Sequence, residues 1–403
     1  MSKKNIAVIF GGRSVEHEIS MISGIQLVEA MDRELYNPIP VYIAHSGKWF
    51  TGDQLLDKQF YRGLPNCLEN LDEVTLIPNP EAGGLTILKS ANTSFLSSLS
   101  SKKEKVIPVD VYIPAFHGTY GEDGCIQGLF EMADAAYAGS DVLASAVAMD
   151  KSIAKYVAAQ NGIPVLPSVL ISKNEFQTSV SKTRSKIIET EGLSEFPLFI
   201  KPVHLGSSIG ISKANNEQEL DAGLAQVFRY DDKAIIEPCV VDIMEINISI
   251  LDTTEKRIAS VTEIPVGTDG VLSYEDKYLQ NSGGKKGAPS ESQGMANLSR
   301  VIDPQDLDPN IKERVQEYAL KFAEVINSSG VGRYDFIIDT STNKVYFNEL
   351  NPIPGSFSFY LWEKSKPPVI YTQLINRLID RAIDRKASLA SYEKDTGFKA
   401  LFK

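Results

Sequence analysis

The chain has 403 residues, 43% of them hydrophobic, and its 52 acidic side chains against 41 Lys and Arg give a formal net charge of −11. This composition is typical of a well-cored globular protein of about two to four structural units, and it excludes a disordered chain or a disulfide-rich miniprotein. The acidic balance also argues against a nucleic-acid partner, because binders of the phosphate backbone usually carry a basic surface.

Cysteine usage and hydropathy bear on location. Cys67, Cys125 and Cys239 are widely spaced, without a CxxC or a His-rich neighbour, so neither a disulfide framework nor a zinc site is indicated. The start of the chain lacks the apolar core of a signal peptide, and no apolar run approaches the ~20 residues of a membrane span. We therefore expect a protein of the reducing cytoplasm with no membrane partner.

The first part of the chain predicts a sheet with crossover helices. An apolar strand at 5–10 is followed by the turn Gly11-Gly12 and by a helix over 15–31. A second buried strand at 109–116 leads through a glycine loop into another helix, in which apolar residues recur at helical spacing over 126–133. The pattern of strand, glycine turn and helix thus occurs twice.

The second part of the chain predicts a small sheet. A short helix over 151–160 ends at Gly162 and Pro164. Two extended stretches follow, FPLFIKPV at 196–203 and AIIEPCVV at 234–241, and the first leads into a glycine-serine hairpin.

The third part predicts more strands and one long helix. Strands are expected at 246–251 and 257–265, a polar loop at 273–299 and a helix over 308–327, before a hairpin made of GRYDFIID and KVYFNELNP. One face of the helix is apolar and should be buried, at Val315, Ala319, Phe322 and Ile326.

We therefore expect an α/β chain of three domains. The predicted domains are an N-terminal parallel-sheet domain at 1–145, a small central sheet domain at 146–240 and a C-terminal antiparallel-sheet domain at 241–403. Residues 45–105, rich in Ser, Asn, Gly and Lys, are interpreted as a peripheral elaboration of the first domain.

The hairpin carries the most informative side chains. Side chains alternate faces along a strand, so Arg333 and Asp335 share one face of the first strand, and Glu349 and Asn351 share one face of the second. With a three-residue loop at 341–343, residue 335 lies opposite 349 and residue 333 opposite 351. Two carboxylates and a carboxamide in one place suit Mg²⁺, which binds through carboxylates and substrate phosphates. Taken alone, the pattern also fits a solvated hairpin with an ion pair.

Two glycine-rich stretches could hold phosphate or another anion. KPVHLGSSIG at 201–210 puts a lysine at a strand end before a loop whose backbone N–H groups and hydroxyls can wrap a polyphosphate. GGRSVEHEIS at 11–20 puts Gly11 and Gly12 before a helix N-terminus, with Glu16 in its first turn. Alone, the first stretch also fits an ordinary turn, and the second an ordinary strand-to-helix junction capped by Ser14.

The order and spacing of these pieces resemble the D-alanine:D-alanine ligases of the ATP-grasp superfamily. The motifs are GGRSVEHEIS at 11–20, HGTYGEDGCIQG at 117–128, MDK at 149–151, KPVHLGSSIG at 201–210, EPCVVDIMEI at 237–246, YEDKY at 274–278, GRYDF at 332–336 and NELNPIPG at 348–355. They span nearly the whole chain. The resemblance implies the ATP-grasp fold, with substrate binding in the N-terminal domain and the metal and catalytic site in the C-terminal domain.

The resemblance also implies ATP and two Mg²⁺ or Mn²⁺ ions as cofactors. It implies phosphate contacts for Lys151, Lys201 and Lys277, adenine contacts for Glu237 and the backbone of Pro238, Cys239 and Val240, a ribose contact for Glu245, and metal ligation by Asp335, Glu349 and Asn351. The implied reaction turns the carboxylate of one D-alanine into an acyl phosphate, which the amine of a second D-alanine attacks to give D-alanyl-D-alanine for peptidoglycan.

The remaining implied roles concern the two substrates. Glu16 resembles the family residue that anchors the ammonium group of the first D-alanine, and His117 resembles one near its carboxylate. Ser207 and Tyr278 resemble the pair that links the glycine-serine loop to the loop at 273–299. Arg333 and Gly355 resemble the donors to the oxyanion. Loop closure should keep water from the acyl phosphate.

The resemblance is weakest at the acceptor site. Tyr360 stands where the family usually has a serine contacting the second carboxylate, although Leu361 matches, and the loop at 273–299 is longer and more polar than usual. Alternatives are therefore a related ligase with D-serine, D-lactate or another amino acid as acceptor, and a non-catalytic ATP-binding regulator. The resemblance also implies a homodimer built on the N-terminal domain.

Overall fold

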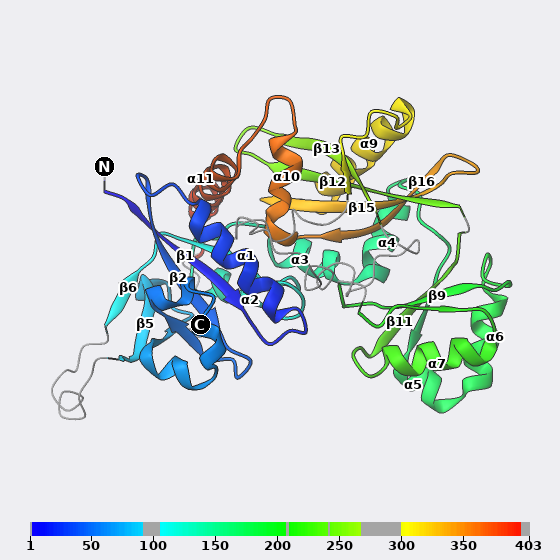
Figure 1. The fold of residues 1–403 in the computed structure, drawn as a ribbon, viewed down its shortest axis with the longest axis horizontal. Coiled ribbons are helices and arrows are strands. Elements are labelled where there is room, and N and C mark those ends of the chain that lie inside the picture. The colour runs from blue at the N-terminus through cyan, green and yellow to red at the C-terminus, as the bar shows by residue number, and fades with distance from the viewer. Residues whose placement is uncertain (1, 92–104, 207–208, 241, 267–299, 396–403) are drawn as a thin grey trace, which may run out of the picture.

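The computed structural model describes residues 2–91, 105–206, 209–240, 242–266 and 300–395, and in these it has three sheets (Figure 1). In Figure 1 the N-terminal sheet lies at the left, the central sheet at the lower right and the C-terminal sheet above them. Ser207, Lys277, Tyr278 and the polar loop predicted at 273–299 fall outside the described residues. No helix in the described part of the chain combines the length and the apolar character needed to cross a membrane.

The N-terminal sheet is mixed. Its order is β6-β5-β4-β3-β2-β1-β7, parallel from β2 through β1 to β7 and antiparallel elsewhere. The interpretation of residues 45–105 as a peripheral elaboration is therefore wrong in part, because they supply three strands of this sheet. The strands are β1 (Lys4–Gly11), β2 (Tyr36–Ile43), β3 (Trp49–Thr51), β4 (Asp72–Leu76), β5 (Gly84–Lys89), β6 (Val106–Pro108) and β7 (Val111–Pro114).

The glycine turn after β1 leads into helix α1 (His17–Ala30). A Cβ on Gly11 would lie 2.4 Å from the carbonyl oxygen of Ile43, so only glycine fits there. The helix begins later than predicted, which puts Glu16 at the N-cap instead of in the first turn. Ser14 is not the cap, but its hydroxyl accepts the N–H of Glu16 at 3.1 Å.

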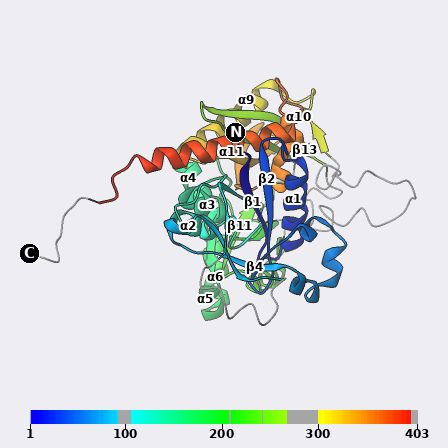
Figure 2. The ribbon, with the colours of Figure 1, turned by 90° about the vertical axis from the view of Figure 1, so that its left-hand side faces the viewer.

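The core of the N-terminal domain is completed by the end of the chain. Helix α11 (Tyr371–Ala390) buries Leu374, Leu378 and Ile379 in the same cluster as Ile6 and Val8 of β1. Figures 1 and 2 show α11 beside this domain, where it contacts α1 and β7 as well as its sequence neighbour α10.

The central sheet is small and antiparallel, with the order β10-β9-β11-β8. Strands β9 and β10 form the predicted hairpin that carries the glycine-serine loop. The strands are β8 (Val169–Ser172), β9 (Leu198–Pro202), β10 (Ser212–Ala214) and β11 (Lys233–Pro238), and the accompanying helices are α5 (Lys173–Thr178), α6 (Val180–Glu189) and α7 (Glu217–Val227).

The C-terminal sheet is antiparallel, with the order β14-β13-β12-β15-β16. Its core includes the apolar face of α9, so the predicted burial of that face is confirmed. The strands are β12 (Ile243–Asp252), β13 (Arg257–Pro265), β14 (Arg300–Ile302), β15 (Val331–Asp339) and β16 (Lys344–Asn351), and the helices are α3 (Val142–Met149), α4 (Lys151–Gln160), α9 (Pro309–Val325) and α10 (Phe359–Glu363). Helix α2 (Cys125–Met132) belongs to the N-terminal core.

The hairpin of β15 and β16 has the predicted pairing but a different loop. Asp335 lies opposite Glu349 and Arg333 opposite Asn351. Asp339 pairs with Lys344, however, so the connection is one residue longer than predicted. The pairing register shifts after Asp335, because Asn348 forms a β-bulge in the partner strand. This bulge compensates for the additional loop residue.

Candidate active site

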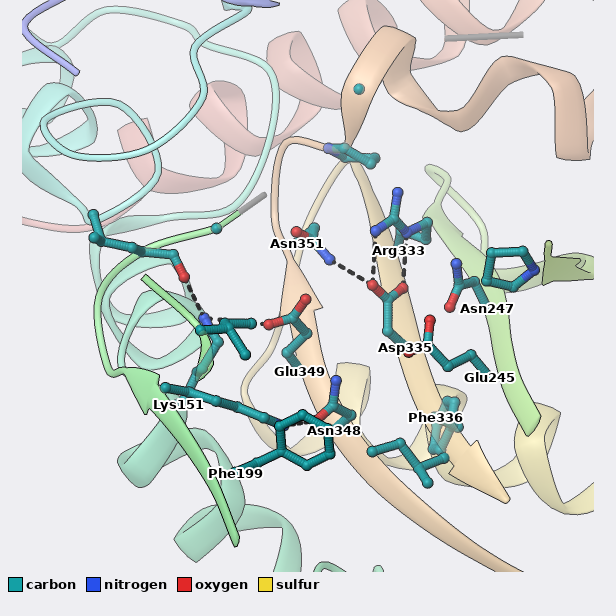
Figure 3. Close-up of a pocket in the computed structure, with 18 of the residues that line it drawn as sticks. Lys151, Phe199, Glu245, Asn247, Arg333, Asp335, Phe336, Asn348, Glu349 and Asn351 are labelled. Atoms are coloured by element: carbon teal, nitrogen blue, oxygen red, sulfur yellow. Dashed lines mark hydrogen bonds and ion pairs between the residues drawn. The ribbon is translucent and has the colours of Figure 1, made fainter. Parts of the chain in front are cut away.

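A cleft collects polar side chains from all three parts of the fold. Glu16 and His117 come from the N-terminal domain, Lys201 from the central sheet and Arg333 from the C-terminal part, where the backbone of Gly355 also lines the cleft. Figure 3 shows the side that the C-terminal hairpin provides, where Arg333, Asp335 and Asn351 point toward one another. Strand alternation accounts for this, because alternate residues of each strand face the same side.

Asp335 is the centre of the hairpin cluster. It receives two hydrogen bonds of 2.7 Å from the Arg333 guanidinium and one of 3.0 Å from the Asn351 amide (Figure 3). Burial alone would lower the pKa of Arg333, but the Asp335 carboxylate outweighs this and raises it well above its ordinary value. Arg333 therefore stays charged at every working pH.

The bulge in β16 turns two consecutive side chains into the cleft. Asn348 accepts a hydrogen bond from Lys201 at 3.3 Å, and the Glu349 carboxylate lies 3.2 Å from the Lys151 ammonium (Figure 3). Asn348 is a cleft residue that the sequence analysis missed. An unbulged strand would point it to the opposite face from Glu349, and the hairpin sequence gave no signal of the bulge.

A buried ion cluster lies at the base of the cleft. Glu237 is fully buried between two ammonium groups: one oxygen lies 2.6 Å from Lys201 Nζ, and the other pairs with Lys155 Nζ. Burial would raise the pKa of Glu237, but the two lysines outweigh this and lower it to about 2. Burial also lowers the pKa of Lys155. Lys155 was missed by the sequence analysis, although it lies one helical turn after Lys151 and so shares its face of α4.

The segment after β11 borders this part of the cleft. Pro238 and Val240 line it together with Glu245. The backbone N–H of Cys239 is directed elsewhere and donates to the Pro197 carbonyl at 3.0 Å.

The carboxylates of Glu122 and Glu16 lie close together where the N-terminal domain lines the cleft. Glu122 accepts the backbone N–H groups of Gly118 at 2.7 Å and Ile353 at 3.2 Å. Burial and the neighbouring Glu16 raise its pKa to about 8, so Glu122 carries a proton at neutral pH. Glu122 lies in the motif HGTYGEDG but was not predicted as a site residue. Its partners Glu16 and Ile353 are distant in the sequence, so no local pattern marked it.

His117 lines the same end of the cleft. Its Nε2 lies 2.8 Å from the Ser23 hydroxyl. Burial lowers the pKa of His117 to about 4, in spite of a hydrogen bond to the Ile353 backbone. The ring is therefore neutral at physiological pH.

Gly355 is followed by an unusual turn. Ser356, Phe357 and Ser358 all have positive φ angles, of 49°, 56° and 50°. Such conformations are costly for non-glycine residues and persist only where their surroundings fix them. Here Ser356 is fully buried and donates to the Gln26 side chain at 2.6 Å, which ties the turn to α1.

Tyr360 and Leu361 lie behind the cleft surface. Leu361 is fully buried, and the Tyr360 hydroxyl donates to Glu263 at 3.1 Å. Arg300 covers the Tyr360 ring, with its guanidinium carbon 4.1 Å from the ring centre, and also pairs with Glu263 at 2.8 Å. Within the described residues, the side chains that line the cleft at this point are Glu263, Arg300 and Asn247, none of which the sequence analysis named.

Comparison with known proteins agrees with this architecture. Residues 5–140 match the family model described as D-ala D-ala ligase N-terminus, and residues 157–380 match the one described as D-ala D-ala ligase C-terminus. The D-alanine–D-alanine ligase of Heliobacterium modesticaldum is 37% identical, over 96% of each chain. That of Caldicellulosiruptor bescii is 35% identical, over 98% of this chain and 100% of the other.

The chain belongs to the D-alanine–D-alanine ligase family.

Solved structures of this family share its fold. The D-alanine–D-alanine ligase of Coxiella burnetii superposes with a TM-score of 0.73 at 27% identity, over 97% of each chain. The VanG D-Ala:D-Ser ligase of Enterococcus faecalis has the same TM-score at 28% identity, over 94% of this chain and 100% of the other. Members of the family are ATP-dependent ligases with the ATP-grasp fold, and the three-sheet architecture described above is that fold.

Proposed function

We propose that the chain joins two D-alanine molecules at the expense of ATP and so supplies D-alanyl-D-alanine for peptidoglycan synthesis. The observation that carries this is the convergence of Arg333, Asp335 and Glu349 with the cationic side chains of Lys151 and Lys201 in one cleft. A carboxylate is a poor electrophile, and its phosphorylation requires positive groups around the transferred phosphoryl group.

The nucleotide would lie between the central and C-terminal sheets. Lys151 and Lys201 would contact its phosphates, the segment from Pro238 to Val240 its adenine, and Glu245 its ribose. Five of these residues line the cleft, all but Cys239, and the two lysines are held in place by Glu349 and Glu237. Their ammonium groups are therefore oriented before any substrate binds.

Asp335, Glu349 and Asn351 would hold magnesium. Two carboxylates and one amide oxygen at one edge of the cleft are the donors that Mg²⁺ accepts beside substrate phosphates. In this structure a cation already faces each carboxylate, Arg333 at Asp335 and Lys151 at Glu349, which fits a pair of sites that favours positive charge. The bound metal would supply neutralisation of the phosphoryl charge.

The reaction would proceed in two steps that the side chains support. An oxygen of the first D-alanine carboxylate forms a bond to the γ-phosphorus while the bond to ADP breaks. The nitrogen of the second D-alanine then attacks the acyl carbon, phosphate leaves with the electron pair of the carbon–oxygen bond, and the nitrogen loses its proton. Arg333 and the Gly355 N–H would stabilise the oxyanion between these events, and Glu16 would hold the first ammonium.

A D-serine acceptor is the second candidate. The similarity to the VanG D-Ala:D-Ser ligase is as close in fold as that to the D-alanine ligase of Coxiella burnetii, and Tyr360 departs from the usual family residue. When two acceptors differ by one methylene or hydroxyl group, their kcat/KM values in an ordinary pocket differ by only roughly 10- to 200-fold. D-lactate or another amino acid as acceptor, a homodimer and a cytoplasmic location remain predictions.

The test measures ATP-dependent phosphate release with each candidate acceptor, followed by identification of the product by mass spectrometry. D-alanyl-D-alanine as the main product supports the proposal, and D-alanyl-D-serine would transfer it to the second candidate. ATP binding without phosphate release with any acceptor would instead indicate a regulator.

A further inference from the structure

His204 bridges two carboxylates at the start of the glycine-serine loop. Its Nδ1 lies 2.9 Å from an oxygen of Asp231, and its Nε2 lies 3.2 Å from an oxygen of Asp150. Ionised carboxylates only accept hydrogen bonds, so both ring nitrogens must donate and the ring is an imidazolium. The backbone N–H of His204 also donates to Asp231, at 2.7 Å.

Asp150 connects this bridge to helix α4. One of its oxygens caps the helix, accepting the N–H groups of Ser152 and Ile153 at 3.0 Å each, and its other oxygen receives His204. The next residue, Lys151, makes two more connections to the loop. Its N–H donates to the Val203 carbonyl at 3.3 Å and its ammonium to the Leu205 carbonyl at 2.6 Å. Three successive loop residues are therefore tied to the first turn of α4.

The charges around His204 favour its protonated form. Asp150 faces it from the start of α4, Asp231 and Asp232 from the turn before β11, and Lys233 from β11, where its ammonium lies 3.5 Å from Asp150. The hydrogen bonds to Asp150 and Asp231 raise the pKa of His204 to about 9. Potential metal-ligand atoms also lie close together on His204, Asp231 and Asp232. A doubly protonated imidazole ring, however, has no free lone pair with which to bind a metal ion.

We propose that His204 is a positioning residue for the nucleotide phosphates, which holds the start of the loop against helix α4 so that the loop backbone and Lys151 face the cleft together. This rests on the proposed function, since it assumes that the loop and Lys151 contact phosphate. Leu205 and Gly206 line the cleft beside Lys151 and Lys201. Glycine has a wide choice of backbone conformations, and a fixed first segment lowers the ordering cost that the ligand must meet.

The first test replaces His204 and measures ATP kinetics. His204→Gln removes the positive charge and leaves donors on one nitrogen only, so we expect the KM for ATP to rise about tenfold, the loss of about one charge-assisted hydrogen bond, with kcat changed by less than about threefold. His204→Arg keeps a charged two-sided donor and should restore most of the affinity. Lys233→Gln is the matched control, because it removes the other cation at Asp150 without touching the loop, and it should change the KM by less than about twofold.

The pH profile separates positioning from simple folding support. The ring loses its proton as pH rises through about 9, and the neutral imidazole then donates from only one nitrogen. The KM for ATP of the unaltered protein should therefore rise through that pH, and that of His204→Gln should not show this rise. The chain has only four histidines, so comparison of proton NMR spectra with this variant assigns the His204 ring and gives its pKa directly.

Binding of the β,γ-imido analogue of ATP, measured by calorimetry, keeps the inference independent of the acceptor. If the protein binds the analogue but forms no dipeptide, the proposed function fails while the variants still test His204. An unchanged affinity in His204→Gln, or an ordinary pKa for the ring, would overturn the inference. Failure of the unaltered protein to bind the analogue would overturn both.

Discussion

Arg333 and Asp335, two residues apart on strand β15, are joined by two parallel hydrogen bonds of 2.7 Å, and both groups are oriented toward the cleft. The guanidinium is thereby fixed in plane before any substrate arrives. A donor whose orientation is fixed in advance stabilises a developing oxyanion without reorganisation during the reaction.

Arg333→Lys should consequently reduce kcat by about 10²- to 10³-fold, because an ammonium cannot make the paired contact and also face the oxyanion. Dipeptide formation at saturating substrates measures this. A reduction of less than about threefold would show that Arg333 serves only as the ion-pair partner of Asp335.

Glu349→Ala should abolish turnover and leave the fold intact. The substitution removes a carboxylate that we assign to magnesium and that also holds Lys151 at 3.2 Å. Dipeptide formation at saturating Mg²⁺ is measured beside circular dichroism. Glu363→Ala, at an exposed position on α10, is the matched control and should keep normal activity. Near-normal turnover of a folded Glu349→Ala protein would disprove the metal assignment.

Glu122 should give the reaction a pH dependence. Its pKa of about 8 means that it gains a negative charge as pH rises through that value, next to Glu16 and the proposed site of the first ammonium. The kcat/KM for the first D-alanine, which reports groups of the free enzyme, should therefore rise through about pH 8. The rise should be absent in Glu122→Ala. An identical profile in that variant would assign the titration to another group.

Glu237→Gln should destabilise the protein by about 3–5 kcal/mol, because two buried ammonium groups lose the carboxylate that lies between them. The matched control is Glu175→Gln, whose pair with Lys186 is about half exposed and should contribute at most about 1 kcal/mol. Urea unfolding measures both. Since the pKa of Glu237 is lowered from 4.5 to about 2, its contribution is present above pH 4.5 and is lost as pH falls toward about 2. Equal unfolding free energies for the two variants would contradict the prediction.

Tyr360 should influence the choice of acceptor through Glu263. Tyr360→Phe removes the hydrogen bond to Glu263 but keeps the ring under Arg300, whereas Tyr360→Ser removes both contacts. We expect the amines D-alanine and D-serine to be used in preference to D-lactate by the unaltered protein. We also expect Tyr360→Ser to shift the ratio of the two amine products further than Tyr360→Phe. Competition among the three acceptors near pH 6 and near pH 8, with products separated by mass, measures both. Mainly depsipeptide near pH 6 would refute the amine preference.

The sequence predicted the site best where strand alternation decides the geometry. Arg333, Asp335, Glu349 and Asn351 converge as expected, because any register that pairs 335 with 349 brings all four together. The loop length was wrong and the pairing was right, because the bulge at Asn348 compensates for the additional loop residue. Bulges depend on packing against neighbouring strands, which a single sequence does not reveal.

Residues whose partners are distant in the sequence were harder to find. Glu122 depends on Ile353 and Glu16, and Arg300 depends on Tyr360, so none of these pairs leaves a local pattern. Strands β3 to β5 were not predicted because they are short and polar residues separate them. Lys155 was the exception, since its spacing from Lys151 already placed both on one face of α4.

The packing of α11 against α1 and β7 has a consequence for biosynthesis. Ile6 and Val8 share one core with Leu374 and Leu378, so a core that begins with an early strand is completed by a helix made much later. A ribosome adds roughly 5–20 residues per second, and domains that emerge first usually fold first. Here the core of the N-terminal domain stays incomplete, with part of its apolar surface exposed, until residues 371–390 have been synthesised. A chain that stops before residue 371 would lack α11 and leave that face uncovered, a surface of the kind that chaperones and proteases recognise.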